Sequence, residues 1–166
     1  MAKELKQLDD LFHDTLKDIY YAEKKILASL PKMAKAAQNP DLKAAFEKHR
    51  GETQEQVSRL EKVFASIDEK PQGKKCEAIE GILDEGKEIM DEYKGSPALD
   101  AGLISAAQAV EHYEICRYGT LATWADELGN REGAKLLKET LGEEEDTDEA
   151  LSELAETCVN QQAEAA

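Results

Sequence analysis

The glutamates of this 166-residue chain repeat at a fixed offset between its two halves. Glu23 and Glu52 are 29 positions apart, as are Glu114 and Glu143, and the second pair follows the first by 91 positions. The same offset aligns further residues of identical type, among them Leu30 with Leu121, Asn39 with Asn130 and Gly51 with Gly142. Because the aligned asparagines fall where each half is expected to turn, the pattern predicts two helical hairpins that together form a four-helix bundle.

Composition predicts an all-α fold in a single domain. Aromatic residues are only 5% of the chain, and alanine, leucine, glutamate and lysine dominate it, which is typical of long helices. A chain of 166 residues can bury a core but is short for two domains. We therefore expect one domain over 1–166, with a hairpin over about 5–68, a connector over 69–97 and a second hairpin over about 98–158.

Apolar residues recur every three, four or seven positions, which is the spacing of one helix face. This spacing predicts helices over about 5–38, 40–68, 76–93, 98–128 and 131–158. Asn39 before Pro40, and Asn130 after a glycine, are predicted to cap the second and the last of these helices. Pro31 is predicted to bend the first helix, and residues 160–166 are expected to fray.

Charge and missing motifs exclude several classes of function. The net charge is -15, whereas binding to phosphates requires clustered lysines and arginines, so we expect no direct contact with nucleic acid. No window approaches 18 consecutive apolar residues, and the first residues lack the apolar stretch of a signal peptide, so we expect no membrane contact and a cytoplasmic location. The three cysteines are too far apart for a CxxC motif, and Walker, GxGxxG and GxSxG motifs are absent.

Two glutamates fall on the apolar faces of their helices. At 100° per residue, Glu23 lies in the middle of a row of apolar residues that continues through Ile26. Glu114 takes the equivalent place in the third long helix, in a row with Val110 and Leu121. Both carboxylates are therefore predicted to point into the core.

The other two long helices also bring polar side chains to their apolar faces. In the second helix the apolar stripe is centred close to His49, with Glu52 about 60° to one side, so both side chains are predicted to reach the interior. In the last long helix the stripe passes between Glu143 and Glu144. The sequence leaves open whether one or both of these glutamates turn inward.

Several inward carboxylates require neutralisation, because burying an ionised carboxylate without a partner is unfavourable by several kcal/mol. Divalent metal ions bound between the glutamates would offset this cost, and the duplicated placement of the glutamates favours that interpretation. The alternative is that the glutamates pair with Arg50, Arg59 or Arg117, or extend to the surface.

This arrangement resembles the ferritin-like superfamily, in which two helices each contribute a glutamate and the other two each contribute Glu-x-x-His. Glu23 and Glu114 match the first pair of positions. The segments that begin at Glu52 and Glu143 have a carboxylate where the superfamily pattern has histidine. The resemblance makes His49, one turn before Glu52, the candidate for the missing imidazole.

Four segments carry a more specific resemblance, namely Tyr21-Ala-Glu-Lys-Lys, Val110-Glu-His-Tyr-Glu-Ile, Tyr118-Gly-Thr-Leu and Ala134-Lys-Leu-Leu-Lys-Glu-Thr-Leu. Through them nearly the whole chain resembles the bacterial YciF-like proteins (DUF892), a ferritin-like, stress-associated family without an established reaction. The resemblance implies a four-helix bundle, a homodimer and a candidate dinuclear metal site.

The two resemblances also imply roles for the candidate ligands of two iron or manganese ions per chain, since oxygen-rich sites suit these metals. Glu52 and Glu143 would bridge or chelate the ions. Glu23 and Glu114 would be terminal ligands, and His49 would bind one ion through its neutral imidazole.

Glu111 and Glu144 complete the candidate ligand set. Glu111 lies one turn before the inward glutamate of its helix, and an extra carboxylate of this kind accompanies peroxide chemistry in ferritin-like peroxidases. Its alternative role is a salt bridge or an exposed position. Glu144 shares the apolar side of the last long helix, whereas Glu55 and Asp146 lie farther from the apolar stripes and are second-rank candidates.

Two functions remain, and whether the chain is an enzyme stays open. In the first, a dinuclear iron or manganese site reacts with oxygen or peroxide and so consumes small oxidants. In the second, the bundle is a structural or interaction protein of the stress response whose site is degenerate or empty. The absence of Glu-x-x-His favours the second. A large iron-storing cage is not expected, because the connector helix and the resemblance both favour a dimer.

Overall fold

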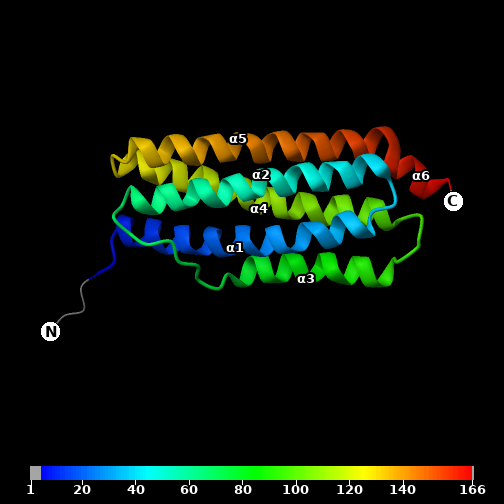
Figure 1. Cartoon of the computed structure of the whole chain (residues 1–166), viewed down its shortest axis with the longest axis horizontal. Coiled ribbons are helices and arrows are strands. Elements are labelled where there is room, and N and C mark those ends of the chain that lie inside the picture. The colour runs from blue at the N-terminus through cyan, green and yellow to red at the C-terminus, as the bar shows by residue number, and fades with distance from the viewer. Residues whose placement is uncertain (1–4, 166) are drawn as a thin grey trace.

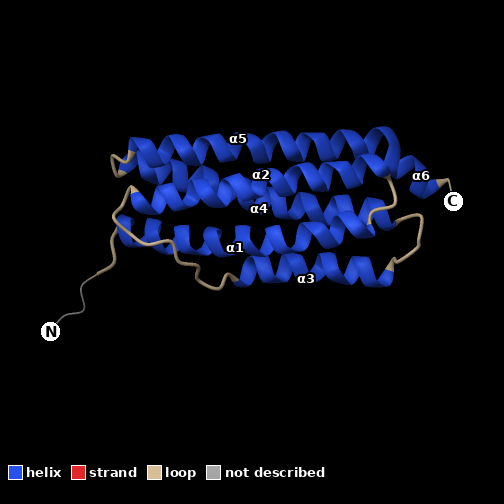
Figure 2. Ribbon diagram, in the orientation of Figure 1, coloured by secondary structure: helices blue, strands red, loops and turns tan. Residues whose placement is uncertain are grey.

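The computed structural model describes residues 5–165, in which helices joined by loops are present and no strand occurs. Figure 2 shows the helices, and Figure 1 shows their order along the chain. Their bounds are Leu8–Ala36 for α1, Pro40–Ala65 for α2, Glu77–Glu92 for α3, Leu99–Glu127 for α4, Arg131–Leu154 for α5 and Asn160–Glu164 for α6, with a π-helical turn over Ala155–Val159 between the last two. The predicted all-α fold is confirmed.

Four long helices form the bundle, and a fifth lies outside it. The α1–α2 and α4–α5 hairpins each pack internally, and contacts of α1 with α4 and of α2 with α5 join the two hairpins (Figure 1). Helix α3 runs beside α1 and α4 and covers only part of their length (Figure 1). Its approach to α4 is close, because a Cβ atom at Gly102 would lie 2.7 Å from Cγ2 of Ile89. The predicted bundle of two hairpins with a helical connector is therefore observed.

Two asparagine caps and one aspartate fix the turns of the hairpins. The Asn39 side chain accepts hydrogen bonds from two amides in the first turn of α2, and Asn130 accepts one from the Gly133 amide. Asp100 of α4 accepts hydrogen bonds from the amides of Gln38 and Asn39, at 2.8 and 2.7 Å. Both predicted caps are confirmed, and Asp100 ties the turn of the first hairpin to the start of the second.

Helix α1 continues through Pro31 as a single element, and the bend predicted at this proline stays a prediction. Two other predicted helix features differ from the structure. Helix α2 ends before Asp68, whose φ of 57° is left-handed and cannot extend the helix. Residues 160–164 form α6 rather than a frayed tail. Residues 1–4 and Ala166, which the predictions also covered, lie outside the described residues.

The core is made of aliphatic and aromatic side chains from all five long helices. Its largest fully buried members include Phe12 and Leu16 of α1, Phe64 of α2, Ile79 of α3 and Tyr118 of α4. In the described part of the chain, no helix is both long enough and apolar enough to cross a bilayer.

Candidate metal centre

Midway along the bundle, the apolar core gives way to a group of buried acidic and imidazole side chains. Glu23 of α1, His49 of α2, Glu111 and Glu114 of α4, and Glu144 of α5 are each at most 3% exposed. We call these five residues the central cluster. Since ionisable side chains are almost never this deeply buried unless they are paired, the central cluster requires a physical explanation.

Four of the five side chains of the central cluster are close enough to share one cation. One ligand atom each of His49, Glu111, Glu114 and Glu144 can be chosen so that all four lie within 4.8 Å of one another. Nε2 of His49 is 3.3 Å from Oε1 of Glu111 and 3.9 Å from Oε2 of Glu144. Ligand atoms on one divalent ion lie about 3 to 4 Å apart when each bond is about 2.1 Å, so a small contraction of this group would complete a coordination shell.

Glu23 is positioned by a tyrosine from the opposite hairpin. The Tyr118 hydroxyl donates a hydrogen bond to Oε1 of Glu23, and both side chains are completely buried. The other carboxylate oxygen of Glu23 has no hydrogen-bond partner, and Glu23 adds to the loss of hydration in raising the pKa of Glu114. Glu23 therefore belongs electrostatically to the same site, although it lies outside the four-residue group that could share one ion.

Unsatisfied polar atoms are concentrated at this site. Within the described residues, every buried side-chain nitrogen or oxygen without a hydrogen-bond partner belongs to the central cluster or to Glu52 and Gln56 beside it. Both oxygens of Glu114, both oxygens of Glu144 and both ring nitrogens of His49 are among them. Each such buried group is unfavourable by about 1 to 3 kcal/mol. The protein therefore buries polar atoms without hydrogen-bond partners at this site, although it does not do so in the rest of the described core.

Burial makes these carboxyl groups hold protons when no cation is present. Loss of hydration, with the nearby charge of Glu144, raises the pKa of Glu23 to about 8. Loss of hydration also raises the pKa of Glu111 and of Glu114 well above the ordinary value, and it raises the pKa of Glu144. The charges of these carboxylates therefore require neutralisation, by protons or by a bound cation.

Glu52 lies at the edge of the site, between His49 and the surface. Its carboxylate is 2.8 Å from the Lys48 ammonium, and its Oε2 is 3.8 Å from Nδ1 of His49. Its side chain is 28% exposed, and the neighbouring His49 and Lys48 lower its pKa. The structure thus places Glu52 beside the cluster as an ionised carboxylate that reaches solvent.

Glu143, predicted with Glu52 to bridge or chelate the ions, is paired with Arg59 beside the cluster. Its two oxygens each lie 2.9 Å from a guanidinium nitrogen of Arg59, and its Oε2 also accepts a hydrogen bond from Gln56 at 3.0 Å. Its neighbour Glu144 is completely buried in the cluster. Because Arg59 already satisfies the Glu143 carboxylate, Glu143 is not grouped with the cluster, and its role as a bridging or chelating ligand stays a prediction. The arginine pairing considered as an alternative for the glutamates thus applies to Glu143, whereas the glutamates of the cluster form no ion pair with arginine.

The two second-rank candidates, Glu55 and Asp146, are exposed and do not belong to the buried cluster. Tyr118 and Gln56 had no predicted role, yet Tyr118 hydrogen-bonds Glu23, and Gln56 hydrogen-bonds Glu143, the neighbour of Glu144. Helical spacing could have drawn attention to Tyr118, which follows Glu114 by four positions on the same face of α4.

Relatives of the chain match it over nearly its whole length. Residues 7–164 match the family described as "Domain of unknown function (DUF892)". The chain is 46% identical over 161 residues to Protein YciF of Escherichia coli (strain K12), and the alignment covers 96% of this chain and 97% of YciF.

Solved structures show the same fold. The crystal structure of the E. coli stress protein YciF has a TM-score of 0.89, and the match covers 94% of this chain and 99% of that one. YcfI of Rhodopseudomonas palustris, for which a structural role has been proposed, is 42% identical with a TM-score of 0.86, over 92% of this chain and 97% of that one. A Xanthomonas campestris protein is 25% identical with a TM-score of 0.74, over 96% and 98% of the two chains.

Proposed function

The chain belongs to the DUF892 family, and from that premise we propose that it is a stress-associated bacterial protein that binds iron or manganese in its central cluster. We further propose that two ions bind per chain and that they react with oxygen or peroxide in the cytoplasm. One observation carries the proposal, namely that the unsatisfied buried polar atoms of the described chain all gather at this one site.

The ligand types of the central cluster fit divalent iron and manganese. Four buried carboxylates and one imidazole are the ligand types that iron and manganese prefer, whereas thiolates, which favour softer metals, are absent from the cluster. Two divalent cations would neutralise the four carboxylates with the imidazole neutral. His49, Glu111, Glu114 and Glu144 would hold one ion, and Glu23 with Glu114 and Glu144 would hold the other.

The protein contributes orientation and exclusion of water. Bound iron or manganese would supply the electrons for reduction of an oxidant. Tyr118 holds one oxygen of Glu23 and leaves the other directed at the site, while Arg59 keeps Glu143 out of it. The buried apolar core that surrounds the cluster limits the access of bulk water to it.

Adjacent glutamates on α5 provide a matched test. Protein purified without chelator, and again after anaerobic loading with ferrous iron, would be subjected to elemental analysis beside Glu144→Gln and Glu143→Gln variants. We expect about two ions per chain in the unmodified protein, retained in Glu143→Gln and lost in Glu144→Gln, because only Glu144 faces the cluster. No metal in the unmodified protein, or equal loss in both variants, would contradict the proposal.

A second function is supported by the structural role proposed for YcfI and by the proton affinity of the cluster. In this alternative the carboxyl groups share protons, and the bundle acts in the stress response as a structural or interaction protein. Thermal unfolding would then be the same with manganese, with ferrous iron and with chelator.

A further inference from the structure

An apolar cavity of about 50 Å³ adjoins the His49 and Glu111 side of the central cluster. Its walls are aliphatic and aromatic side chains from all five long helices, chiefly Ile26, Leu30, Phe46, Leu83, Val110 and Leu151. His49 and Glu111 form its buried inner end, and the exposed Lys48 and Ala150 mark its outer end. The cavity therefore connects the surface between α2 and α5 with one side of the candidate metal centre.

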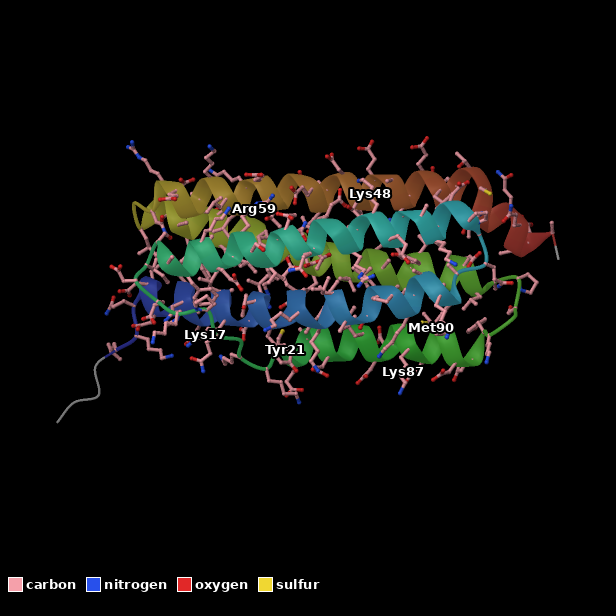
Figure 3. The ribbon with its side chains drawn as sticks, viewed as in Figure 1. Lys17, Tyr21, Lys48, Arg59, Lys87 and Met90 are labelled. Atoms are coloured by element: carbon pink, nitrogen blue, oxygen red, sulfur yellow. The ribbon has the colours of Figure 1, made fainter. Side chains whose placement is uncertain are left out.

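The two sides of the cluster along α2 differ in polarity. Figure 3 labels Lys48 and Arg59, which lie on α2 on either side of the cluster. Toward Arg59 the space is filled by hydrogen-bonded groups, since Arg59 contacts Thr140 and Glu143. Toward Lys48 the cavity is walled mainly by apolar side chains. A molecule that approaches the cluster from the Lys48 side thus passes through apolar surroundings.

The size of the cavity limits its occupant. A volume of about 50 Å³ exceeds the roughly 10 to 15 Å³ that one water needs, and it is well below the about 150 Å³ of an apolar cavity known to hold benzene. An ordered water requires two to four polar partners, and most of the lining offers none, although Ser29, Glu52 and Thr147 border the cavity beside His49 and Glu111. The fitting occupant is an apolar molecule of a few heavy atoms.

We propose that this cavity is a binding site for dioxygen, which it holds as an apolar gas at the His49 and Glu111 edge of the central cluster. The purpose of the site rests on the proposed function, because dioxygen held there would lie beside the ions. Binding itself needs no metal, since the apolar walls and the size of the cavity alone provide it.

Xenon is a suitable probe for the dioxygen site, because a xenon atom is apolar and similar in size to a dioxygen molecule. Crystals of the metal-free protein would be pressurised with xenon, and its anomalous scattering would locate the bound atoms. We expect a xenon atom between Phe46, Val110 and Leu151. Ordered water at that place, or no xenon there, would overturn the inference.

Filling the cavity gives the second arm of the experiment. Ala107→Leu on α4 places a larger side chain in the wall and should abolish xenon binding, whereas Ala109→Leu, at an exposed position on the same helix, should leave it unchanged. Ala150→Leu at the outer end provides a further variant, at an exposed site that tolerates the change. Xenon binding that persists in both cavity variants would contradict the proposal.

The two proposals fail in different ways. If the unmodified protein binds xenon but no iron, the result contradicts the proposed metal function and supports the apolar binding site. If it binds iron but no xenon, the result contradicts the dioxygen site and supports the metal function. Where both hold, ferrous Ala107→Leu protein should keep the metal content of the unmodified protein and lose rate in its oxidation by dioxygen.

Discussion

The hydroxyl of Tyr118 donates a hydrogen bond to the carboxylate of Glu23 across 95 positions of sequence, inside the bundle core. This contact joins the two hairpins at the level of the candidate metal centre. It also leaves one oxygen of Glu23 without a partner, and that oxygen is free for a cation.

Removing this hydroxyl should destabilise the metal-free protein. In Tyr118→Phe, the Glu23 carboxyl would lose its hydrogen bond while it stays buried, so we expect the free energy of unfolding to fall by about 1 to 3 kcal/mol. Urea unfolding of metal-free protein measures this change. Tyr113→Phe on the same helix is the control, because that hydroxyl contacts Cys76 and not the cluster. A larger loss in Tyr113→Phe than in Tyr118→Phe would contradict the role given to the Glu23 contact.

The stability of the metal-free protein should fall as pH rises from about 4.5 to about 8. Over this range folded Glu23, whose pKa is raised to about 8, keeps a proton that the unfolded chain has released. Each such proton makes unfolding easier by about 1.4 kcal/mol per pH unit, and Glu111, Glu114 and Glu144 act in the same direction.

Urea unfolding at intervals across this pH range checks the slope. The Glu23→Gln variant cannot take up or release the proton at this position, so its stability should depend less on pH than that of the unmodified protein. Equal slopes for the two proteins would show that Glu23 does not titrate as its burial implies.

Metal ions should stabilise the folded protein through the central cluster. Saturating manganese, at a concentration about 100-fold above its dissociation constant, raises the free energy of unfolding by about 2.7 kcal/mol for one site. We expect a higher midpoint of thermal unfolding with manganese, reversal by chelator, and no response in Glu114→Gln, whose two oxygens are both without partners in the core. A response in Glu114→Gln equal to that of the unmodified protein would place the bound ions elsewhere.

Arg59 should stabilise the pairing of α2 with α5. In Arg59→Met, Glu143 loses two guanidinium hydrogen bonds, and the loss in free energy of unfolding should be about 1 to 2 kcal/mol, because Glu143 is 31% exposed and water replaces part of the interaction. Arg50→Met, at an exposed position on the same helix, should change stability little. Chemical denaturation measures the free energy of unfolding of the unmodified protein and of the two variants. Equal values for all three would contradict a stabilising role of the Arg59–Glu143 pair.

A homodimer stays a prediction from the family resemblance. Gel filtration with light scattering should give a mass of twice 18.4 kDa. The structure exposes Leu11 of α1 by 48% and Leu128 after α4 by 40%, which is apolar surface that an interface would cover. A mass of 18.4 kDa, or that of a large cage, would contradict the prediction.

The fold could be predicted from the chain because its determinants are local. Apolar spacing fixes which face of each helix is buried, and Asn39 with Pro40 fixes where α2 begins. The buried positions of Glu23, Glu114 and His49 followed from the same spacing. Their role as metal ligands stays a prediction until metal analysis tests it.

The repeat that pointed to the site does not describe it fully. The offset of 91 positions pairs Glu52 with Glu143, yet Glu52 lies at the edge of the site and Glu143 binds Arg59. The buried Glu144 corresponds in the first half to Thr53, which is also completely buried. The two hairpins therefore share a fold, but they contribute different side chains to the cluster.

The sequence by itself determined the helices, their caps, the pairing into hairpins and the presence of carboxylates on apolar faces, because each depends on residues close together along the chain. Only the tertiary structure decided that Glu144 and not Glu143 faces the cluster, since the two differ by 100° around α5 and the choice depends on Arg59 from another helix. It also decided the position of the apolar cavity, because five helices must pack together before their side chains enclose that space.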